Sequence, residues 1–142
     1  MYRKILVALD TTPSDQELLP HIVQLATLVR AELLLLHVAD GWVARNFDQL
    51  NLAESEEMKE DWHYLENTAA RLRTETGLTI DTRLALGNPP KQILKLAEME
   101  NCDLIALASH GHRLVGDIIH GSTIEFVRHK ARIPILVVPA KK

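Results

Sequence analysis

The sequence contains few of the residues on which several classes of protein depend. Its one cysteine, Cys102, cannot form an internal disulfide, which agrees with a reducing compartment. Tryptophan, tyrosine and phenylalanine occur only twice each, and 16 Lys and Arg stand against 19 Asp and Glu, for a net charge of −3. Nucleic-acid binding requires clustered positive charge with interleaved aromatic rings, so the composition argues against a nucleic-acid-binding protein.

Long apolar runs are also missing. No stretch approaches the roughly 20 consecutive apolar residues that span a bilayer, and the longest runs, 31–37 and 133–139, have the length of buried strands. Residues 1–5 lead into the first apolar run without the pattern of a signal peptide, so we expect a cytoplasmic protein without membrane insertion. At 142 residues, 46% of them hydrophobic, the chain is expected to form one domain over residues 1–142.

Apolar patterns predict five strands that alternate with four helices. The strands are expected at residues 4–9, 33–38, 78–86, 104–108 and 133–138. Three helices are expected around apolar repeats that begin at Leu18, Met58 and Ile93, and a fourth over residues 122–132. In the second repeat, Met58 and Trp62 are interpreted as core residues. Strands that alternate with helices predict an α/β fold, in which an open, doubly wound parallel sheet carries helices on both faces.

Two features of the strands predict the order 3-2-1-4-5. Residues 78–86 alternate apolar and polar side chains, which indicates an edge strand with one face in water. Pro134 has no amide hydrogen to donate, which indicates that the last strand lies at the other edge. The apolar first and fourth strands then take the centre. A ligand is expected beyond the carboxyl ends of these two strands, where the winding direction reverses.

Residues that suit an anionic ligand follow the fourth strand. Gly111 and the segment 121–123, Gly-Ser-Thr, provide glycine turns and hydroxyl groups before the last helix. Backbone amides at such a helix start converge on phosphate oxygens, and the helix dipole adds to the attraction. An ordinary helix cap has the same residue pattern, so both interpretations stay open on these residues alone.

Other polar residues are interpreted as structural. Ser14 and Glu17 are expected to form a capping box at the start of the first helix, with Asp15 beside them as a solvated charge. His37 is interpreted as a satisfied core histidine and Cys102 as an inert, half-buried thiol.

Two loops carry further candidates. Three histidines lie in the loop after the fourth strand, and we interpret them as solvated side chains rather than as metal ligands. They are His110, His112 and His120. Residues 39–53 lack a clear period and contain Trp42 and Phe47, which indicates a lid or binding loop.

The segment after the fourth strand also follows a spaced glycine motif. Ala108-Ser109-His110-Gly111 is followed by nine residues and then by Gly121-Ser122. This spacing resembles Gly-x2-Gly-x9-Gly-(Ser/Thr), the motif of ATP-binding members of the universal stress protein family. The segments that also resemble the family are 4–10, 36–38, 87–89 and 134–139, so the likeness covers essentially the whole chain. It implies an adenine nucleotide alpha-hydrolase-like fold.

The resemblance implies a role for each matching position. The residues implied to surround adenine and ribose are Ala8, Asp10, Val38, Leu107 and Ala108. Those implied to hold the phosphates are Gly111, Arg113, Gly121, Ser122 and Thr123. Ala108 stands where the motif has glycine, and its methyl group is expected to crowd the ribose or to shift the loop. The implied ligand is ATP or AMP, with or without magnesium.

Three functions are open at this point. The first is a regulatory module of the stress response, in which a bound adenine nucleotide changes a surface that an unidentified regulatory protein binds. The second is a slow ATPase in which Asp10 holds a metal-bound nucleotide. The third is a ligand-free interaction protein whose pocket Ala108 has closed. A Gly-x4-Gly-Lys-(Ser/Thr) loop is absent, which favours binding over turnover.

The last strand further predicts a homodimer. Residues 133–138 are almost wholly apolar, and Pro134 indicates an edge position, where unpaired backbone groups invite another chain. A second copy related by a two-fold axis would cover this edge, and the family resemblance implies the same assembly.

Overall fold

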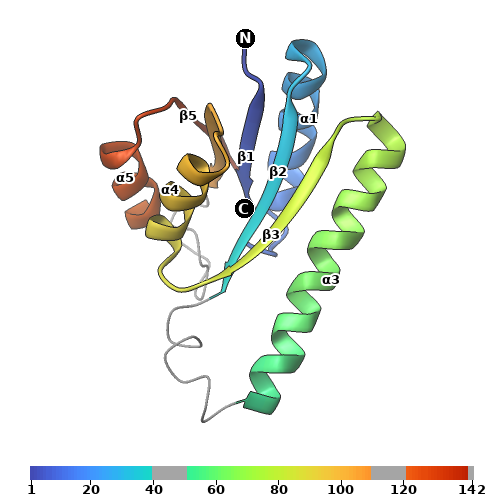
Figure 1. Ribbon diagram of the computed structural model, residues 1–142, viewed down its shortest axis with the longest axis vertical. Helices are drawn as coiled ribbons and strands as arrows, with labels where there is room; N and C mark the ends of the chain where they lie inside the picture. The colour runs from blue at the N-terminus through green and yellow to red at the C-terminus, as the bar shows by residue number, and fades with distance from the viewer. Residues whose placement is uncertain (40–50, 110–120, 141–142) are drawn as a thin grey trace.

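The computed structural model describes residues 1–39, 51–109 and 121–140, in which strands and helices alternate (Figure 1). The elements in chain order are β1 (Lys4–Ala8), α1 (Asp15–Val29), β2 (Glu32–Ala39), α3 (Asn51–Thr76), β3 (Ile80–Leu86), α4 (Pro89–Met99), β4 (Leu104–Ser109), α5 (Gly121–Lys130) and β5 (Ile135–Pro139). Of the loop expected at 39–53, Ala39 belongs to β2 and residues 51–53 to α3, whereas 40–50, with Trp42 and Phe47, lie outside the described residues.

The five strands form one parallel sheet in the order β3-β2-β1-β4-β5, as the sequence predicted. Central β1 pairs with β2 from Lys4 opposite Glu32, and with β4 from Ile5 opposite Leu104. The two edges are β3, whose burial alternates along its first half, and β5, which follows Pro134. The alternation of apolar and polar residues in β3 and the absence of an amide hydrogen in Pro134 therefore identified the two edge strands correctly.

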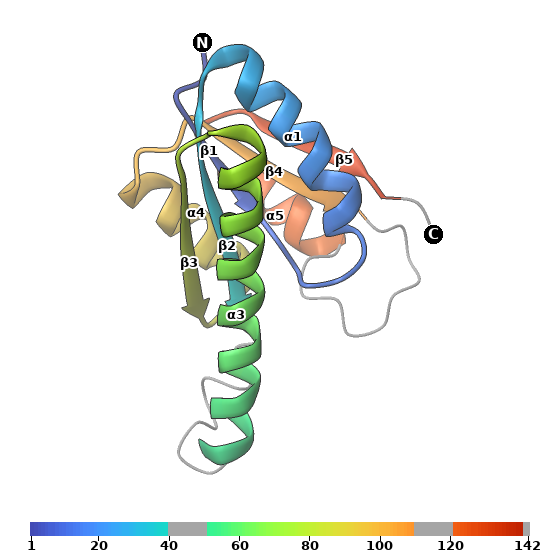
Figure 2. The ribbon, with the colours of Figure 1, turned by 90° about the vertical axis from the view of Figure 1, so that its right-hand side faces the viewer.

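Helices cover both faces of the sheet and bury two separate apolar clusters. In Figures 1 and 2, α1 and α3 lie on one face and α4 and α5 on the other. Successive strand residues point to opposite faces, so Ile5 and Val7 pack under α1 and α3, while Leu6 and Ala8 pack under α4 and α5. Burying a side chain the size of Leu6 contributes about 2 kcal/mol. The two clusters together form the core.

Helix α3 is longer than the sheet that it covers. Its 26 residues span about 39 Å, whereas the 7 residues of β3 span about 23 Å. Figure 2 shows the N-terminal part of α3 continuing past the strand ends. Leu65 and Ala69 are fully buried, but Trp62 is 44% exposed and Met58 is only partly covered. The interpretation of Trp62 and Met58 as core residues was therefore wrong, because they lie on the part of the helix that leaves the sheet.

The start of α4 follows local sequence rules. Gly87 has a φ of +129°, which favours glycine, and Asn88 accepts a hydrogen bond at its side-chain oxygen from the Lys91 amide at 3.1 Å. Pro89 occupies the first turn, where its missing donor costs nothing. Within the described ranges, none of the helices combines the length and apolar character that crossing a membrane demands.

Candidate functional site

The candidate site lies where the chain leaves the carboxyl ends of β1 and β4. These strands are neighbours at the centre of the sheet, and the chain passes from β1 to α1 on one face and from β4 toward α5 on the other (Figure 1). Because α1 and α5 lie on opposite faces of the sheet, the winding direction reverses between β1 and β4, and ligands of doubly wound sheets bind at such a reversal. The sheet order thus puts the reversal between β1 and β4, as the sequence predicted, and a ligand site there stays a prediction.

Three of the predicted base-contacting residues come together on one face. Ala8, Val38 and Leu107 lie at or near the carboxyl ends of three neighbouring strands and belong to the apolar cluster under α4 and α5. Each is at most 4% exposed. We call this packed group, which lies toward the carboxyl ends of the three strands, the apolar wall.

Ala108 lies on the other face of the sheet. It pairs with Val138 of β5 and belongs to the cluster under α1 and α3, where it is 4% exposed. Its methyl group therefore fills core space instead of pointing to the side of Ala8 and Leu107. The expectation that this methyl crowds the ribose is not supported by the geometry.

The predicted phosphate-binding residues are only partly described. Gly121, Ser122 and Thr123 form the first turn of α5, with Ser122 exposed and Thr123 buried. The first amides of a helix have no partner within the helix and suit an anion. Gly111 and Arg113 lie outside the described residues, as do His110, His112 and His120.

Asp10 organises the loop that follows β1. One carboxylate oxygen, Oδ1, accepts hydrogen bonds from the Thr12 amide at 3.0 Å, the Thr12 hydroxyl at 2.6 Å and the Ser14 hydroxyl at 3.2 Å. The carboxylate is 4% exposed. Ser14 makes no side-chain capping bond to α1, so the expected capping box is wrong. The serine hydroxyl instead donates to Asp10, four residues earlier, which is a local alternative to the capping box.

Asp15 is a second buried carboxylate, directly behind the same loop. Its Oδ1 accepts from the Asp10 amide at 3.1 Å, and its Oδ2 accepts from the Thr11 amide at 3.0 Å and the Tyr64 hydroxyl at 2.7 Å. Burial raises the pKa of Asp15 to about 7, although the Tyr64 hydrogen bond works in the opposite direction. The interpretation of Asp15 as a solvated charge was therefore wrong. The missing information was the position of Tyr64, 49 residues away.

His37 lies beside this loop on the α1 and α3 side. Its Nδ1 is 2.9 Å from the Leu9 carbonyl oxygen and its Nε2 is 3.4 Å from Oδ2 of Asp61. Burial disfavours the charged form of the ring and by itself lowers the pKa of His37. The contacts with Asp61 and Leu9 favour the charged form more strongly, so the net effect is a raised pKa. The interpretation as a satisfied core histidine is confirmed. In the three ranges with described coordinates, no group of three or more acidic, histidine or cysteine side chains could hold a metal ion.

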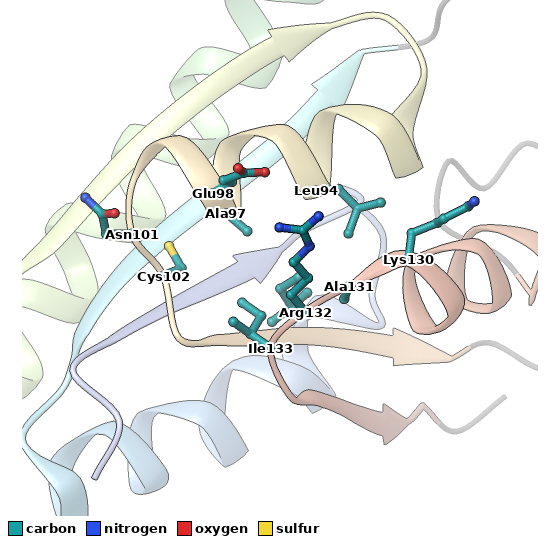
Figure 3. Close-up of a pocket in the computed structure, with 10 residues that line it drawn as sticks. Leu94, Ala97, Glu98, Asn101, Cys102, Lys130, Ala131, Arg132 and Ile133 are labelled. Atoms are coloured by element: carbon teal, nitrogen blue, oxygen red, sulfur yellow. The ribbon is translucent and has the colours of Figure 1, made fainter.

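A cavity of about 510 Å³ lies at the opposite end of the sheet (Figure 3). Figure 3 shows Arg132 reaching from the connection before β5 toward α4, near Glu98 and Leu94. Cys102, which precedes β4, lines this cavity and is 6% exposed, and burial raises the pKa of its thiol to about 11. Ligands of doubly wound sheets bind at the carboxyl ends of the strands, so this cavity at the amino ends is not the candidate site.

Sequence comparison finds relatives over nearly the full chain. The profile of the Universal stress protein family matches residues 1–139. Universal stress protein MJ0577 from Methanocaldococcus jannaschii is 29% identical, covering 99% of this chain and 97% of that protein. Universal stress protein YxiE from Bacillus subtilis is also 29% identical, covering 97% and 99%.

Solved structures share the same architecture. The structure of MJ0577 aligns with a TM-score of 0.85 at 31% identity, over 100% of this chain and 99% of that one. A universal stress protein in complex with cAMP aligns at 0.69 with 17% identity, over 99% and 98%. A universal stress protein from Archaeoglobus fulgidus in complex with dAMP aligns at 0.67 with 21% identity, over 96% and 98%. At these lower identities, the last two establish likeness of fold alone.

Proposed function

Because the chain belongs to the universal stress protein family, we propose that it binds an adenine nucleotide at the carboxyl ends of β1 and β4. In this proposal the nucleotide is ATP or AMP, and binding makes the protein a regulatory module of the stress response in the cytoplasm. A regulatory protein partner would bind the surface that the nucleotide changes.

The observation that carries the proposal is the apolar wall beside Asp10. Ala8, Val38 and Leu107 come from three strands and pack in one cluster, and Asp10 follows two residues after Ala8. An apolar wall with one carboxylate suits a flat base joined to a sugar, since the carboxylate accepts hydrogen bonds from ribose hydroxyls. Ala108 would approach the sugar through its backbone, because its methyl group lies in the opposite cluster.

The first turn of α5 supports the phosphate half of the proposal. Gly121, Ser122 and Thr123 begin the helix, and glycine at its first position lets a phosphate approach the backbone closely. Gly111 and Arg113 complete the phosphate site on the strength of the sequence motif. The complexes of two related folds with cAMP and dAMP support an adenine nucleotide as the ligand class.

Binding without rapid turnover is the expected chemistry. The Oδ1 atom of Asp10 already accepts three hydrogen bonds from Thr12 and Ser14, an arrangement that supports a role in shaping the loop. Slow hydrolysis with magnesium at Asp10 is the second candidate function. Release of phosphate from ATP in a single turnover distinguishes the two.

We also propose that the protein forms a homodimer through β5. This strand lies at the sheet edge, and Val137 is 37% exposed on it. A second copy would cover both the apolar side chain and the free strand edge.

Calorimetry with ATP and AMP tests the nucleotide site. Gly121→Val puts a branched side chain where a phosphate must approach the backbone, and we expect it to abolish binding. Ala70→Val is the matched control, because Ala70 is exposed in the middle of α3. Circular dichroism monitors the fold of both variants. Equal affinities of wild type and Gly121→Val would place the phosphates elsewhere, and no binding by the wild type would leave the ligand-free function.

A further inference from the structure

We propose that Asp15 and Tyr64 act as a positioning pair that holds Asp10 in its binding geometry, an inference that rests on the proposed nucleotide site. The two carboxylate oxygens of Asp15 accept one hydrogen bond each, from the Asp10 amide at 3.1 Å and from the Thr11 amide at 3.0 Å. Tyr64 donates its hydroxyl to the second of these oxygens at 2.7 Å. Neither side chain is among those assigned to the nucleotide, so both act through Asp10.

The backbone at Thr11 requires this support. Thr11 has a φ of +61°, in the left-handed region that a β-branched residue adopts only at a cost of about 1–2 kcal/mol. The Asp10 and Thr11 amides, which immediately precede the rotated N–Cα bond of Thr11, both donate to Asp15, which is 1% exposed. Without that acceptor, one buried and one partly buried amide would lose their partner, and Thr11 would relax to negative φ. Asp10 would then lose the orientation that its bonds to Thr12 and Ser14 depend on.

Tyr64 connects the Asp10 loop to a part of the chain that is distant in the sequence. It lies on α3, whereas Asp10, Thr11 and Asp15 belong to β1, α1 and the loop between them. The tyrosine ring is partly buried between these elements, and its hydroxyl fixes the orientation of the Asp15 carboxylate. The position of α3 is thereby coupled to the geometry of the site. Any partner that shifts α3 would change nucleotide affinity through this one hydrogen bond.

The test compares Tyr64→Phe, Asp15→Asn and the double variant by calorimetry with ATP and with AMP. Tyr64→Phe removes only the donor, and Asp15→Asn replaces one acceptor oxygen by a donor group that faces other donors. Each single change should weaken binding about fivefold to tenfold. If the residues act as one unit, the double variant should lose about as much as Asp15→Asn alone, not the product of the two losses.

Two controls separate positioning from general stability. Tyr2→Phe is the matched tyrosine variant, because Tyr2 packs on the same core at the opposite end of β1. Amide hydrogen exchange by NMR gives a direct readout: exchange at Asp10 and Thr11 should accelerate in Tyr64→Phe. The Lys4 amide is the internal reference, since another carboxylate, that of Asp103, holds it at 3.1 Å.

Each outcome decides between the two proposals. Loss of affinity in Tyr64→Phe, with accelerated exchange at Thr11 and with Tyr2→Phe unchanged, supports the positioning pair. If the wild type binds nucleotide and Tyr64→Phe binds equally well, the positioning pair is overturned while the nucleotide site stands. An equal loss in Tyr2→Phe overturns the pair as well, since the effect would then be general. A wild type that binds neither ATP nor AMP overturns the nucleotide site and, with it, the pair.

Discussion

His37 and Asp61 face one another between β2 and α3, with Nε2 of the imidazole 3.4 Å from Oδ2 of the carboxylate. The other ring nitrogen lies 2.9 Å from the Leu9 carbonyl oxygen, so both nitrogens face acceptors. Only the protonated ring donates from both nitrogens. When the ring is protonated, the His37 side chain, which is 1% exposed, therefore ties the end of β2 to the long helix through both nitrogens.

This pair makes stability depend on pH. The pKa of His37 is raised in the folded protein above its ordinary value of 6.5, so between these two values the folded chain binds more protons than the unfolded chain. The contribution is fully present below about pH 6.5 and is lost as the pH rises through the raised pKa.

Asp61→Asn should remove most of that pH-dependent contribution. We expect a loss of about 1–3 kcal/mol in the free energy of unfolding at pH 6, because the buried ring loses its charged acceptor. The difference from the wild type should shrink at pH 9. Urea unfolding at both pH values measures this difference in the free energy of unfolding. Asp81→Asn is the control, because Asp81 is an exposed residue of β3. A difference that is the same at pH 6 and pH 9 would contradict the protonated pair.

Ala108→Gly should destabilise the fold without improving nucleotide binding. The Ala108 methyl fills the core under α1, and glycine weakens a strand interior, so we expect a loss of about 1 kcal/mol in the free energy of unfolding. Thermal unfolding and calorimetry measure the two effects. Tighter nucleotide binding by the glycine variant would show instead that the methyl group does crowd the ligand.

Cys102 should be a slow nucleophile in the folded protein. Its thiol is 6% exposed, and burial raises its pKa to about 11, so very little thiolate is present at pH 8. We expect iodoacetamide to modify the native protein far more slowly than the urea-unfolded protein, as followed by mass spectrometry. Comparable rates in the two states would mean that the cavity next to Arg132 opens readily.

Val137→Lys should break the proposed dimer. The substitution places like charges across a two-fold axis at β5, whereas the exposed Leu28→Lys on α1 serves as control. Light scattering at micromolar concentration should give twice the chain mass of 16.0 kDa for the wild type and control, and the single mass for Val137→Lys. A wild-type mass of 16.0 kDa would rule out the dimer.

The sheet order was predictable because edge strands carry their own signals. Alternation in β3 and Pro134 before β5 are properties of a few consecutive residues, and alternation of strands with helices leaves few topologies for the rest. The overhang of α3 was not predictable, since an apolar period at Met58 and Trp62 says nothing about where the sheet stops. The apolar repeat marked the correct helical face and overestimated its buried length.

The inner construction of the site depended in part on contacts between residues that lie far apart in the sequence. Asp15 contacts Tyr64, which lies 49 residues later in the sequence, and His37 contacts Asp61, which lies 24 residues later. A helix-start motif around Ser14 indicated a cap, whereas the fold brought a carboxylate, Asp10, within reach of the same hydroxyl. Asp10 lies only four residues before Ser14, so a second local interaction holds the hydroxyl that the capping rule had assigned to the helix start.

The division of the core by the sheet separates two tasks of the site. Among the described residues, the apolar wall that includes Ala8 and Leu107 belongs to one cluster, and the supports of the Asp10 loop lie on the side of the other. Substitutions under α4 and α5 can therefore reshape the wall without disturbing the hydrogen bonds of Asp15. In the proposed site, residues of one cluster would set which ligand fits, and residues on the other side of the sheet would set how firmly Asp10 is held.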